Sequence, residues 1–278
     1  MLRKNSYSCS CVGCGFDILV TKGIPLLVKD RERIDHLMNE VKRSSRASWY
    51  EDSQLDQWHG PYRHHVKKRR RYVENVLGSY IKQVESPIIG LDLCCGDGGN
   101  LPWLSKHFSE IYASDYNLLR LLRASTVAGA KQIFMADVTD YPVLDNSFDV
   151  IYFNHALEHI PDDEKALSEV YRILKPRGLL ILGTPNEGAL FWQLAYHLQP
   201  KVRLRTDHVH FYTAESLRKK CSKAGFVTQE VRPIGWGVPH WWLDSMIRRY
   251  KWVDDLFEMV GRQILPSQAT SLYLVLYK

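Results

Sequence analysis

The pattern of apolar positions changes near residue 87, and the part that follows predicts an α/β fold. From there on, short apolar runs alternate with amphipathic segments. The apolar runs predict strands at residues 88–93, 111–114, 132–136, 148–153, 178–183, 226–231 and 271–277. The amphipathic segments predict helices near residues 100–108, 117–128, 162–174 and 214–224. Such alternation is typical of a mostly parallel sheet covered by helices on both faces.

Two segments rich in aromatic residues interrupt this alternation. Residues 185–212 follow the fifth predicted strand, and residues 234–268 lie between the sixth and the seventh. Because a doubly wound sheet binds its ligands outside the carboxyl ends of its strands, both insertions are placed to act as lids. The tryptophan-rich part of the second insertion, residues 235–257, also fits a contact with a membrane surface or ordinary core packing.

The first third of the chain predicts two helices, at residues 31–43 and 62–84. In the second helix, Val66, Val73, Val76 and Leu77 keep the i, i+3, i+4, i+7 spacing of a buried face. The same helix carries the basic run at residues 67–71. This run fits contact with RNA or an anionic surface, and it equally fits a solvated helix face.

Composition and charge narrow the class of protein. The 278 residues are 45% hydrophobic and 24% charged, which supports a packed core and excludes a mainly disordered chain. No apolar stretch reaches the roughly 18 residues of a membrane span, and the N-terminus lacks the apolar region of a signal peptide. The net charge of +6 lies entirely in residues 1–86, which contain 16 Lys and Arg against 10 Asp and Glu. With no signal peptide and no disulfide framework among the six cysteines, we expect a cytoplasmic protein in a reducing compartment, and peripheral contact with a membrane stays open as an alternative.

The strongest chemical signal is a glycine-rich turn within residues 88–100. Asp92 ends the preceding strand, and Gly96 and Gly98 allow a tight turn and a close approach of the backbone to a ligand. Residues 88–105 contain acids but no Lys or Arg, which disfavours a pyrophosphate. Asp115 follows the second strand, where an acid can hold ribose hydroxyls, and Asp137 follows the third, where a carboxylate can accept from an adenine amino group. S-adenosyl-L-methionine, which has no phosphate and carries a sulfonium, fits this pattern.

The chain resembles the class I S-adenosylmethionine-dependent methyltransferases of small-molecule type. The matching stretches are residues 91–99 (LDLCCGDGG), 136–142 (ADVTDYP), 145–160 (DNSFDVIYFNHALEHI) and 169–186 (EVYRILKPRGLLILGTPN). The resemblance covers residues 70–278 and implies a Rossmann-like, doubly wound sheet of seven strands, the seventh antiparallel between the fifth and sixth. It divides the chain into a small cysteine-containing element at 1–30, a helical cap at 31–86 and a catalytic domain at 87–278.

The resemblance also assigns the cofactor-binding residues. Asp92, Gly96 and Gly98 would line the methionine end, Asp115 would hold the ribose and Asp137 the adenine. Asn154 would close over the cofactor, and Tyr116 and Val138 complete the predicted site. Cys94 departs from the family, which more often has glycine at this position.

The N-terminal cysteines resemble half of a zinc-ribbon-like module. Cys11 and Cys14 have the C-x-x-C spacing of a zinc site, but the second pair that a closed site needs is missing from the chain. Cys9 is a candidate third ligand and His36 a distant fourth. A turn that has lost its metal is the alternative.

Histidines after the fourth strand and in the first insertion are the candidate general bases. His155 and His208 are the residues we select, because histidine can accept a proton from an acceptor group near neutral pH. His210 is a weaker candidate, and Glu158 with His159 more often orients the loop. If this turn is helical, His155, Glu158 and His159 share a face and could hold a divalent metal; the prediction is that no metal is bound.

These observations predict an enzyme that transfers a methyl group to a small-molecule, lipid, quinone or glycan acceptor. An RNA methyltransferase is one alternative; the Asn/Asp-Pro-Pro-Tyr motif of exocyclic-amine methylation is absent, so a nucleic-acid partner is not expected. A cofactor-binding partner or regulator without catalysis is the other. The sequence leaves the oligomeric state open.

Overall fold

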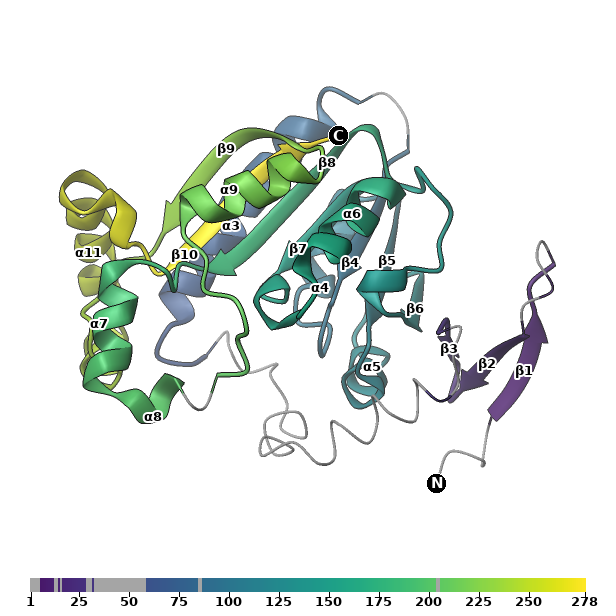
Figure 1. Ribbon diagram of the computed structural model, residues 1–278, viewed down its shortest axis with the longest axis horizontal. Coiled ribbons are helices and arrows are strands. Elements are labelled where there is room, and N and C mark those ends of the chain that lie inside the picture. The colour runs from purple at the N-terminus through teal and green to yellow at the C-terminus, as the bar shows by residue number, and fades with distance from the viewer. Residues whose placement is uncertain are drawn as a thin grey trace.

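The computed structural model describes residues 6–12, 15, 17–28, 32, 59–84, 87–203 and 206–278. Its centre is one ten-stranded sheet with the strand order β1-β2-β3-β6-β5-β4-β7-β8-β10-β9 (Figure 1). The seven strands of the predicted sheet are β4 (Ile89–Leu93), β5 (Glu110–Asp115), β6 (Gln132–Met135), β7 (Phe148–Asn154), β8 (Leu174–Pro185), β9 (Val227–Ile234) and β10 (Ser271–Tyr277). Strand β10 lies antiparallel between β8 and β9, as the resemblance implied.

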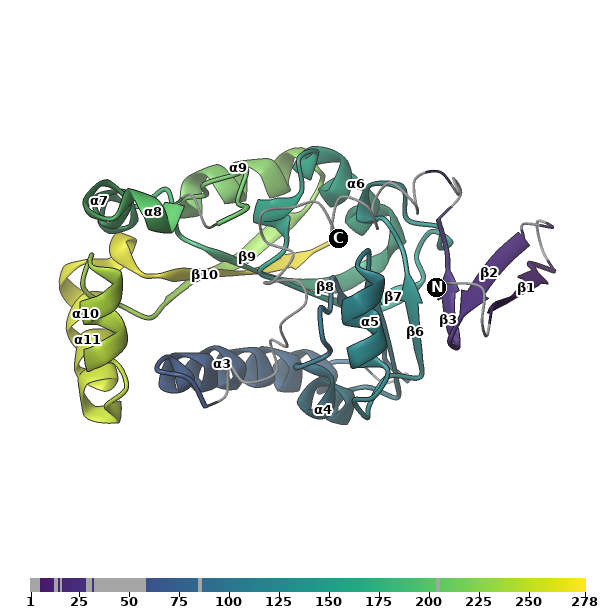
Figure 2. The ribbon, with the colours of Figure 1, turned by 90° about the horizontal axis from the view of Figure 1, so that it is seen from below.

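Helices cover both faces of the sheet, which confirms the doubly wound α/β fold. One face carries α3 (Arg63–Ile81), α4 (Leu101–Leu104) and α5 (Leu118–Ala124), and the other carries α6 (Asp163–Ile173) and α9 (Ala214–Lys223) (Figure 2). Short 3₁₀ turns lie at Ser105–His107, Val138–Asp140, Leu157–His159 and Pro266–Gln268. Successive strand residues alternate between two apolar cores: on β8, Leu180 packs with the α6 side and Ile181 with the α3 side.

The N-terminal element continues the sheet at its β6 edge. Strands β1 (Ser6–Ser10), β2 (Asp17–Thr21) and β3 (Ile24–Leu26) form an antiparallel meander. Strand β3 joins β6 in parallel through Leu26 and Met135, and the amide of Leu27 donates to the carbonyl of Met135 at 2.8 Å. The sheet therefore has three strands more than the seven we expected.

The predictions for residues 29–58 fall almost wholly outside the described residues, including the helix at 31–43 and His36. Cys14 is also outside them. Cys9 lies on β1 with an exposed side chain, and Cys11 directly follows that strand. The zinc-ribbon-like element and the three-part domain division therefore remain predictions.

The basic helix α3 is amphipathic as predicted, but its cations have several different environments. Lys67 and Arg71 are exposed, whereas Lys68 forms an ion pair with Asp254 at 2.6 Å. Arg70 pairs with Glu74 one turn later, at 2.9 Å. Arg69 points into the cavity described below. The run is thus only partly a solvated face.

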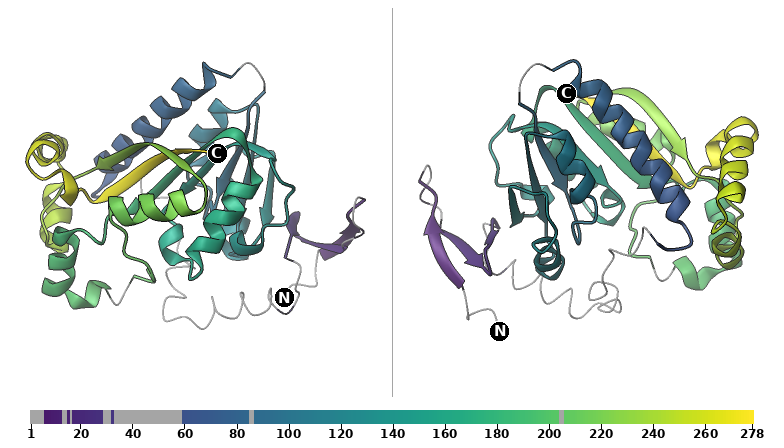
Figure 3. Two further views of the ribbon diagram at one scale, coloured as in Figure 1. Left: turned by 45° about the horizontal axis from the view of Figure 1, so that its top comes forward. Right: turned by 180° about the vertical axis from the view of Figure 1, so that it is seen from behind.

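Four helices from the two insertions gather at one end of the molecule. They are α7 (Leu190–Leu198) and α8 (Pro200–Arg203) from the first insertion, and α10 (Trp241–Ile247) and α11 (Lys251–Ile264) from the second. Figures 1 and 3 show them together beyond the ends of β8, β9 and β10. We call these four the insertion helices. Within the described part of the chain, no helix has the length and apolar character needed to cross a membrane.

Candidate functional site

The glycine-rich turn connects β4 to α4 and requires glycine at two positions. Gly96 and Gly98 have φ angles of +55° and +78°, in the left-handed region that favours glycine. A Cβ on Gly98 would also lie 3.0 Å from the Cβ of Ala124, and one on Gly96 would lie 3.2 Å from Nη1 of Arg120. Any side chain at these positions would therefore strain the backbone and crowd α5, which follows the next strand.

Cys94 occupies a left-handed position in the same turn. Its φ is +56°, which explains why glycine suits this position in the family that the chain resembles. A residue with a Cβ adopts this conformation at a cost of about 1–2 kcal/mol. The turn thus keeps its shape with cysteine, at the expense of local strain.

Asp115 fixes the turn to the end of β5. Its Oδ2 accepts from the amide of Gly96 and its Oδ1 from the amide of Asn117, both at 2.9 Å. The side chain is buried, and burial raises the pKa of its carboxyl. The predicted ribose ligand is therefore also the residue that holds the glycine-rich turn against the neighbouring strand.

Asp92 lies buried at the end of β4, beside Asp115. Burial, together with the charge of Asp115, raises the pKa of Asp92 to about 8. Among the described residues its Oδ2 has no hydrogen-bond partner. A buried acid with an unpaired oxygen fits a ligand that brings a positive charge or a hydrogen-bond donor, as the methionine end of the cofactor does.

The charge around the turn is less negative than its own sequence indicates. Asp97 is buried and forms a bidentate ion pair with Arg123 of α5, both oxygens at 3.0 Å from Nη1. Arg120 of the same helix lines the pocket above Gly96. Residues 88–105 alone would repel a pyrophosphate, but α5 supplies two cations that weaken this repulsion. The glycines and the acids at the strand ends keep the site suited to S-adenosylmethionine.

The predicted adenine-binding residues follow β5 and β6. Asp137 caps the 3₁₀ turn Val138–Asp140, and its Oδ1 accepts from the amide and the hydroxyl of Thr139 at 2.8 and 2.7 Å. Val138 is buried and Tyr116 is half-buried. Of the predicted cofactor-binding residues, only Gly96 and Asn154 line the cavity described next. The part of Asp92, Gly98, Asp115, Tyr116, Asp137 and Val138 in cofactor binding remains a prediction.

A cavity of about 350 Å³ lies over the turn and contains part of the predicted site. It is lined from the turn, from α5, from the end of β7 and from the first insertion. Asn154 lines it, and the Oδ1 of Asn154 accepts from the hydroxyl of Tyr273 at 2.7 Å. Gly183 of β8 leaves the room that Asn154 needs, because a Cβ there would collide with this Oδ1. We call this space the cofactor pocket; Cys94, Cys95, Gly96, Asp97, Gly99, Asn100, Arg120, His155, Glu158, His159, Pro185, Thr206, Asp207 and His208 complete its lining.

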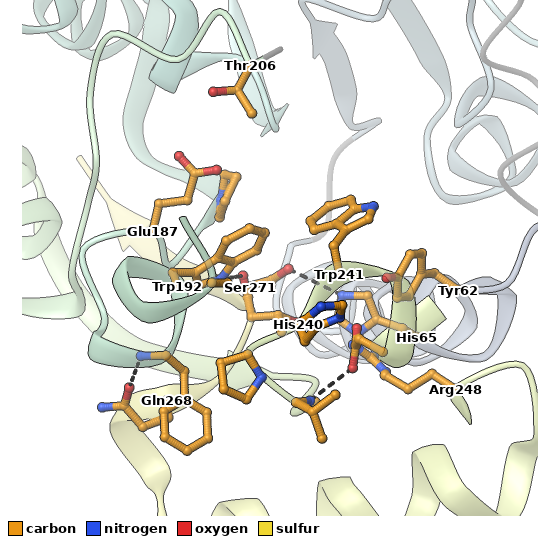
Figure 4. A pocket seen from close by; sticks show the side chains of 18 of the residues that line it. Tyr62, His65, Glu187, Trp192, Thr206, His240, Trp241, Arg248, Gln268 and Ser271 are labelled. Carbon is orange, nitrogen blue, oxygen red and sulfur yellow. Dashed lines mark hydrogen bonds and ion pairs between the residues drawn. The ribbon is translucent and has the colours of Figure 1, made fainter. Parts of the chain in front are cut away.

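A second cavity, of about 290 Å³, lies between α3 and the insertion helices. Aromatic and aliphatic side chains dominate its wall, among them Phe191, Trp192 and Trp241. The indoles of Trp192 and Trp241 have their centroids 5.8 Å apart, and Figure 4 shows Tyr62 beside Trp241. We call this space the apolar cavity. Four residues line both it and the cofactor pocket: His155, Pro185, Thr206 and His208.

His155 lies at the junction of the two cavities in a strained conformation. Its φ is +52°, and Nη1 of Arg69 is 2.5 Å from its Nε2. Its Nδ1 is 3.6 Å from Oε1 of Glu158. Burial and the charge of Arg69 lower the pKa of His155. Because Arg69 donates to Nε2, this nitrogen is not available as a base in the observed arrangement.

His208 lies at the same junction and has a carboxylate partner. Its Nδ1 is 2.7 Å from Oε2 of Glu187, which follows the end of β8 and is buried. The hydroxyl of Tyr196 donates to the other oxygen of Glu187 at 2.5 Å. A histidine oriented in this way keeps its proton on Nδ1 and offers Nε2 as a base. Neither Arg69 nor Glu187 was predicted from the sequence. The position of Glu187, directly after a predicted strand and the Thr-Pro-Asn stretch, could have indicated it. No feature of the basic run distinguished Arg69 from its neighbours.

The other histidines have different surroundings. His210 places Nε2 at 3.1 Å from the carbonyl of Ile160 and lines neither cavity. His159 packs edge-on against His208, with ring centroids 4.5 Å apart, and its Nδ1 is 3.2 Å from Oδ1 of Asp207. Among the described residues, one group of side chains is spaced to hold a metal: Glu158, His159 and His208. The sequence spacing had instead indicated His155, Glu158 and His159. The histidines around Glu158 lower its pKa, although burial alone would raise it.

Comparison with known proteins agrees with this geometry. A family model described as a methyltransferase domain matches residues 62–231. The chain belongs to this family. The predicted fold class, family and cofactor, S-adenosylmethionine, are thereby confirmed, and the methyltransferase activity is confirmed at the level of the domain.

Individual relatives are distant. The chain is 32% identical over 126 residues to a malonyl-[acyl-carrier protein] O-methyltransferase of Buchnera aphidicola. The matched region covers 44% of this chain and 49% of that protein. It is 30% identical over 105 residues to a demethylmenaquinone methyltransferase of Lactobacillus johnsonii, and this match covers 34% of the chain and 43% of that protein. The crystal structure of an S-adenosylmethionine-dependent methyltransferase from Mesorhizobium loti superimposes with a TM-score of 0.51 at 18% identity, over 69% of this chain and 92% of that one. The chain spans about half the length of the curated relatives it matches, and the structural likeness shows the fold alone.

Proposed function

We propose that this protein transfers the methyl group of S-adenosylmethionine to a hydrophobic small molecule bound in the apolar cavity. One observation carries the proposal: the apolar cavity and the cofactor pocket share a wall at His155 and His208. In-line transfer requires the acceptor atom to lie about 3–3.5 Å from the methyl carbon, so the acceptor space must adjoin the cofactor space. Two adjoining spaces of different polarity meet this requirement.

The lining of the apolar cavity supports a lipid-like or quinone-like acceptor. Its aromatic side chains, among them Phe191, Trp192 and Trp241, suit an apolar ring or chain. The demethylmenaquinone methyltransferase among the relatives supports a quinone-like acceptor, and the malonyl-[acyl-carrier protein] O-methyltransferase supports an anionic one.

The surroundings of Arg69 favour an acceptor that carries a negative charge or acquires one during the reaction. Among the described side chains, no carboxylate lies within ion-pair distance of its guanidinium, whereas Lys68 and Arg70 on either side are paired. A partly buried cation without a counter-charge stabilises a negatively charged oxygen of a ligand. Arg69 would thus bind a carboxylate, or a phenolate that forms as the acceptor loses its proton.

His208 is the general base in this proposal, and Glu187 is the residue that positions it. The bound cofactor supplies the electrophilic methyl group. His208 takes the proton of the acceptor hydroxyl at Nε2, and Glu187 stabilises the imidazolium that results. The insertion helices exclude water from the acceptor. His155, which accepts from Arg69, holds that cation at the junction.

The test uses the full-length protein with labelled S-adenosylmethionine and a fractionated cell extract. We expect label to enter the small-molecule, lipid-soluble fraction. Ala195→Phe, which fills the apolar cavity from α7, should abolish this transfer while cofactor binding by calorimetry is unchanged. Leu194→Phe, one residue away on the outer side of α7, is the matched control. Label in RNA, or transfer that Ala195→Phe leaves intact, would overturn the proposal, and cofactor binding without any transfer would favour a regulator.

We also propose a cytoplasmic location. The described cysteines Cys9, Cys11, Cys94, Cys95 and Cys221 are all free thiols. Free thiols in this number suit a reducing compartment. Cell fractionation with an antibody against the full-length chain would check the assignment.

A further inference from the structure

Helix α11 carries a stripe of large apolar side chains that faces solvent. Trp252 and Ile264 are each 69% exposed, and Leu256, Met259 and Val260 between them are also exposed. The positions recur at helical spacing, so the five side chains lie on one face of the helix. A soluble surface helix normally turns such a stripe toward the core.

Polar contacts on the opposite face hold α11 in this orientation. Asp254 is buried and pairs with Arg248 at 2.9 Å and with Lys68 of α3 at 2.6 Å. Glu258 accepts from the amide of Gly235 at 3.0 Å. Gly261 packs against the indole of Trp236, which leaves no room for a side chain. Rotation of the helix to bury its apolar stripe would break all of these contacts.

Helices α10 and α7 repeat this arrangement. On α10 the buried positions are Asp244 and the following Arg248, whereas Trp242 is 62% exposed and Met246 also faces solvent. On α7, Leu190, Leu194 and Leu198 are exposed one turn apart from each other. The three helices lie at the same end of the molecule (Figures 1 and 2). We call their exposed apolar side chains the insertion face: Leu190, Leu194, Leu198, Trp241, Trp242, Leu243, Met246, Trp252, Leu256, Met259, Val260 and Ile264.

The insertion face is surrounded by positive charge. The segments 59–71, 190–203 and 240–265 together contain twelve Lys and Arg but only four Asp and Glu. Lys68 and Arg248 pair with the buried acids, and Lys251 and Arg262 pair with Asp255 and Glu258. Arg70 pairs with Glu74, and Arg69 lines the apolar cavity. Six cations of these segments remain for the surface: Arg63, Lys67, Arg71, Lys201, Arg203 and Arg249. The start of α3 belongs to this surface, because Nη2 of Arg63 donates to the carbonyl of Arg249 at 2.8 Å. Exposed Arg249, which comes just after the end of α10, therefore lies between the apolar side chains of that helix and the start of α3.

We propose that the insertion face binds the surface of an anionic lipid bilayer. Amphipathic helices that lie in a membrane interface combine an outward apolar stripe with flanking Lys and Arg, and tryptophan is favoured at the depth of the headgroups. Both features occur here, on helices whose buried sides are polar. The cations would contact the negative headgroups and the apolar side chains would enter the boundary with the acyl chains.

A second copy of the chain is a poorer occupant of this surface. In a two-fold symmetric dimer the same patch would meet itself, and the cations around it would face cations. Like charges brought together in this way oppose association. An anionic bilayer covers the apolar side chains and neutralises the cations at the same time.

Membrane binding would place the mouth of the apolar cavity at the bilayer. Trp241 belongs to the insertion face and also lines the cavity, so the two are continuous. A hydrophobic acceptor could then pass from the lipid phase into the cavity without crossing water; this consequence rests on the function proposed above. The binding itself does not depend on it.

The test is co-sedimentation of the full-length protein with vesicles of two compositions. We expect binding to vesicles in which phosphatidylglycerol replaces part of the phosphatidylcholine, and weaker binding to phosphatidylcholine alone or at high salt. The double variant Trp252→Ser with Ile264→Ser should bind at least about tenfold more weakly. The matched control is Leu144→Ser with Val227→Ser, which removes side chains that are 83% and 68% exposed outside the insertion face.

Three further measurements are needed to interpret the sedimentation result. Cofactor binding by calorimetry and the thermal midpoint should be the same in both double variants and the wild type, which shows that the variants are folded. Binding that is unaffected by Trp252→Ser with Ile264→Ser, or no binding to anionic vesicles, overturns the inference. A dimer in sedimentation velocity that this variant dissociates would assign the face to a second copy instead. Vesicle binding and methyl transfer are measured separately, so failure of one is distinguishable from failure of the other.

Discussion

Arg69 and His155 are 86 residues apart in the sequence, yet Nη1 of Arg69 lies 2.5 Å from Nε2 of His155. The contact joins helix α3, which precedes strands β4 to β10 in the chain, to the residue that directly follows β7. It brings one cation of the basic helix to the junction of the two cavities, and it occupies the nitrogen of His155 that could otherwise accept a proton. Several testable consequences arise from this pair and from its neighbours.

Replacing Arg69 by Gln should raise the pKa of His155. Burial is the main cause of the lowered pKa and stays in place, but the charge of Arg69, the second cause, is removed. Because the folded-state pKa lies below the ordinary value of 6.5, the unfolded chain binds more protons near that pH and stability falls as the pH decreases through 6.5. In Arg69→Gln this fall should be smaller. Proton NMR titration of the imidazole and urea unfolding at several pH values measure both effects; Arg71→Gln, an exposed cation of the same helix, is the control.

Replacing Glu187 by Gln should slow methyl transfer without affecting the cofactor. The amide of Gln cannot stabilise the imidazolium of His208, so we expect kcat to fall by about 100-fold, within the range of general base catalysis. The calorimetric affinity for S-adenosylmethionine should stay at the wild-type value. Glu215→Gln, at an exposed position of α9, should leave both unchanged. A wild-type kcat in Glu187→Gln would exclude His208 as the base that we propose.

Replacing Asp115 by Asn should weaken cofactor binding by about tenfold or more, since it affects a buried, charge-assisted interaction. Both oxygens of Asp115 accept backbone amides, and the NH₂ group of Asn cannot accept. The glycine-rich turn would then lose one of its attachments to β5. Calorimetry gives the affinity, and Asp145→Asn, at an exposed carboxylate distant from the turn, is the comparison. Equal affinities for the two variants would contradict the assignment.

At Cys94, glycine should be more stabilising than alanine. Both substitutions remove the thiol, but only glycine removes the strain of a Cβ at a φ of +56°. We expect the free energy of unfolding of Cys94→Gly to exceed that of Cys94→Ala by about 1 kcal/mol, which is the cost of the left-handed conformation for a residue with a Cβ. Urea unfolding of both variants measures the difference. At an ordinary helical position the order is reversed, so alanine being the more stable here would show that the turn relaxes.

Removing Asp254 should destabilise the end of the molecule that carries α10 and α11. Arg248 would be left buried without its main partner, at a cost of about 3–5 kcal/mol. Asp255→Ala removes a neighbouring but partly exposed acid and should cost little. Hydrogen exchange, read by mass spectrometry on peptides from 241–264, would show the loss of protection in Asp254→Ala. Unchanged exchange there would mean that Arg248 finds another acceptor.

The seven strands of the main sheet, the doubly wound arrangement and the glycine-rich turn could all be predicted because their signals are local. A buried strand next to a helix shows in a few consecutive residues, and Gly96 and Gly98 mark a turn that the backbone alone requires. The charges around that turn could not be predicted in this way, because they come from a separate helix. The ion pair of Asp97 with Arg123 and the position of Arg120 depend on how α5 packs, and the sequence of the loop by itself overstated its negative charge.

The sequence by itself determined the fold class and the cofactor, and it predicted site residues at the ends of β4 and β5 and the histidines from which a base would be chosen. Only the tertiary structure shows that Glu187 contacts His208 and that Arg69 contacts His155, because these contacts join distant segments of the chain. The tertiary structure also decided which faces of α10 and α11 turn inward. The sequence left the tryptophan-rich segment 235–257 open as a lid, a membrane contact or core packing. The ion pairs of Asp254 with Arg248 and Lys68 turn the polar face of α11 inward, because a buried charge must keep its partner more strictly than an apolar side chain must avoid the surface.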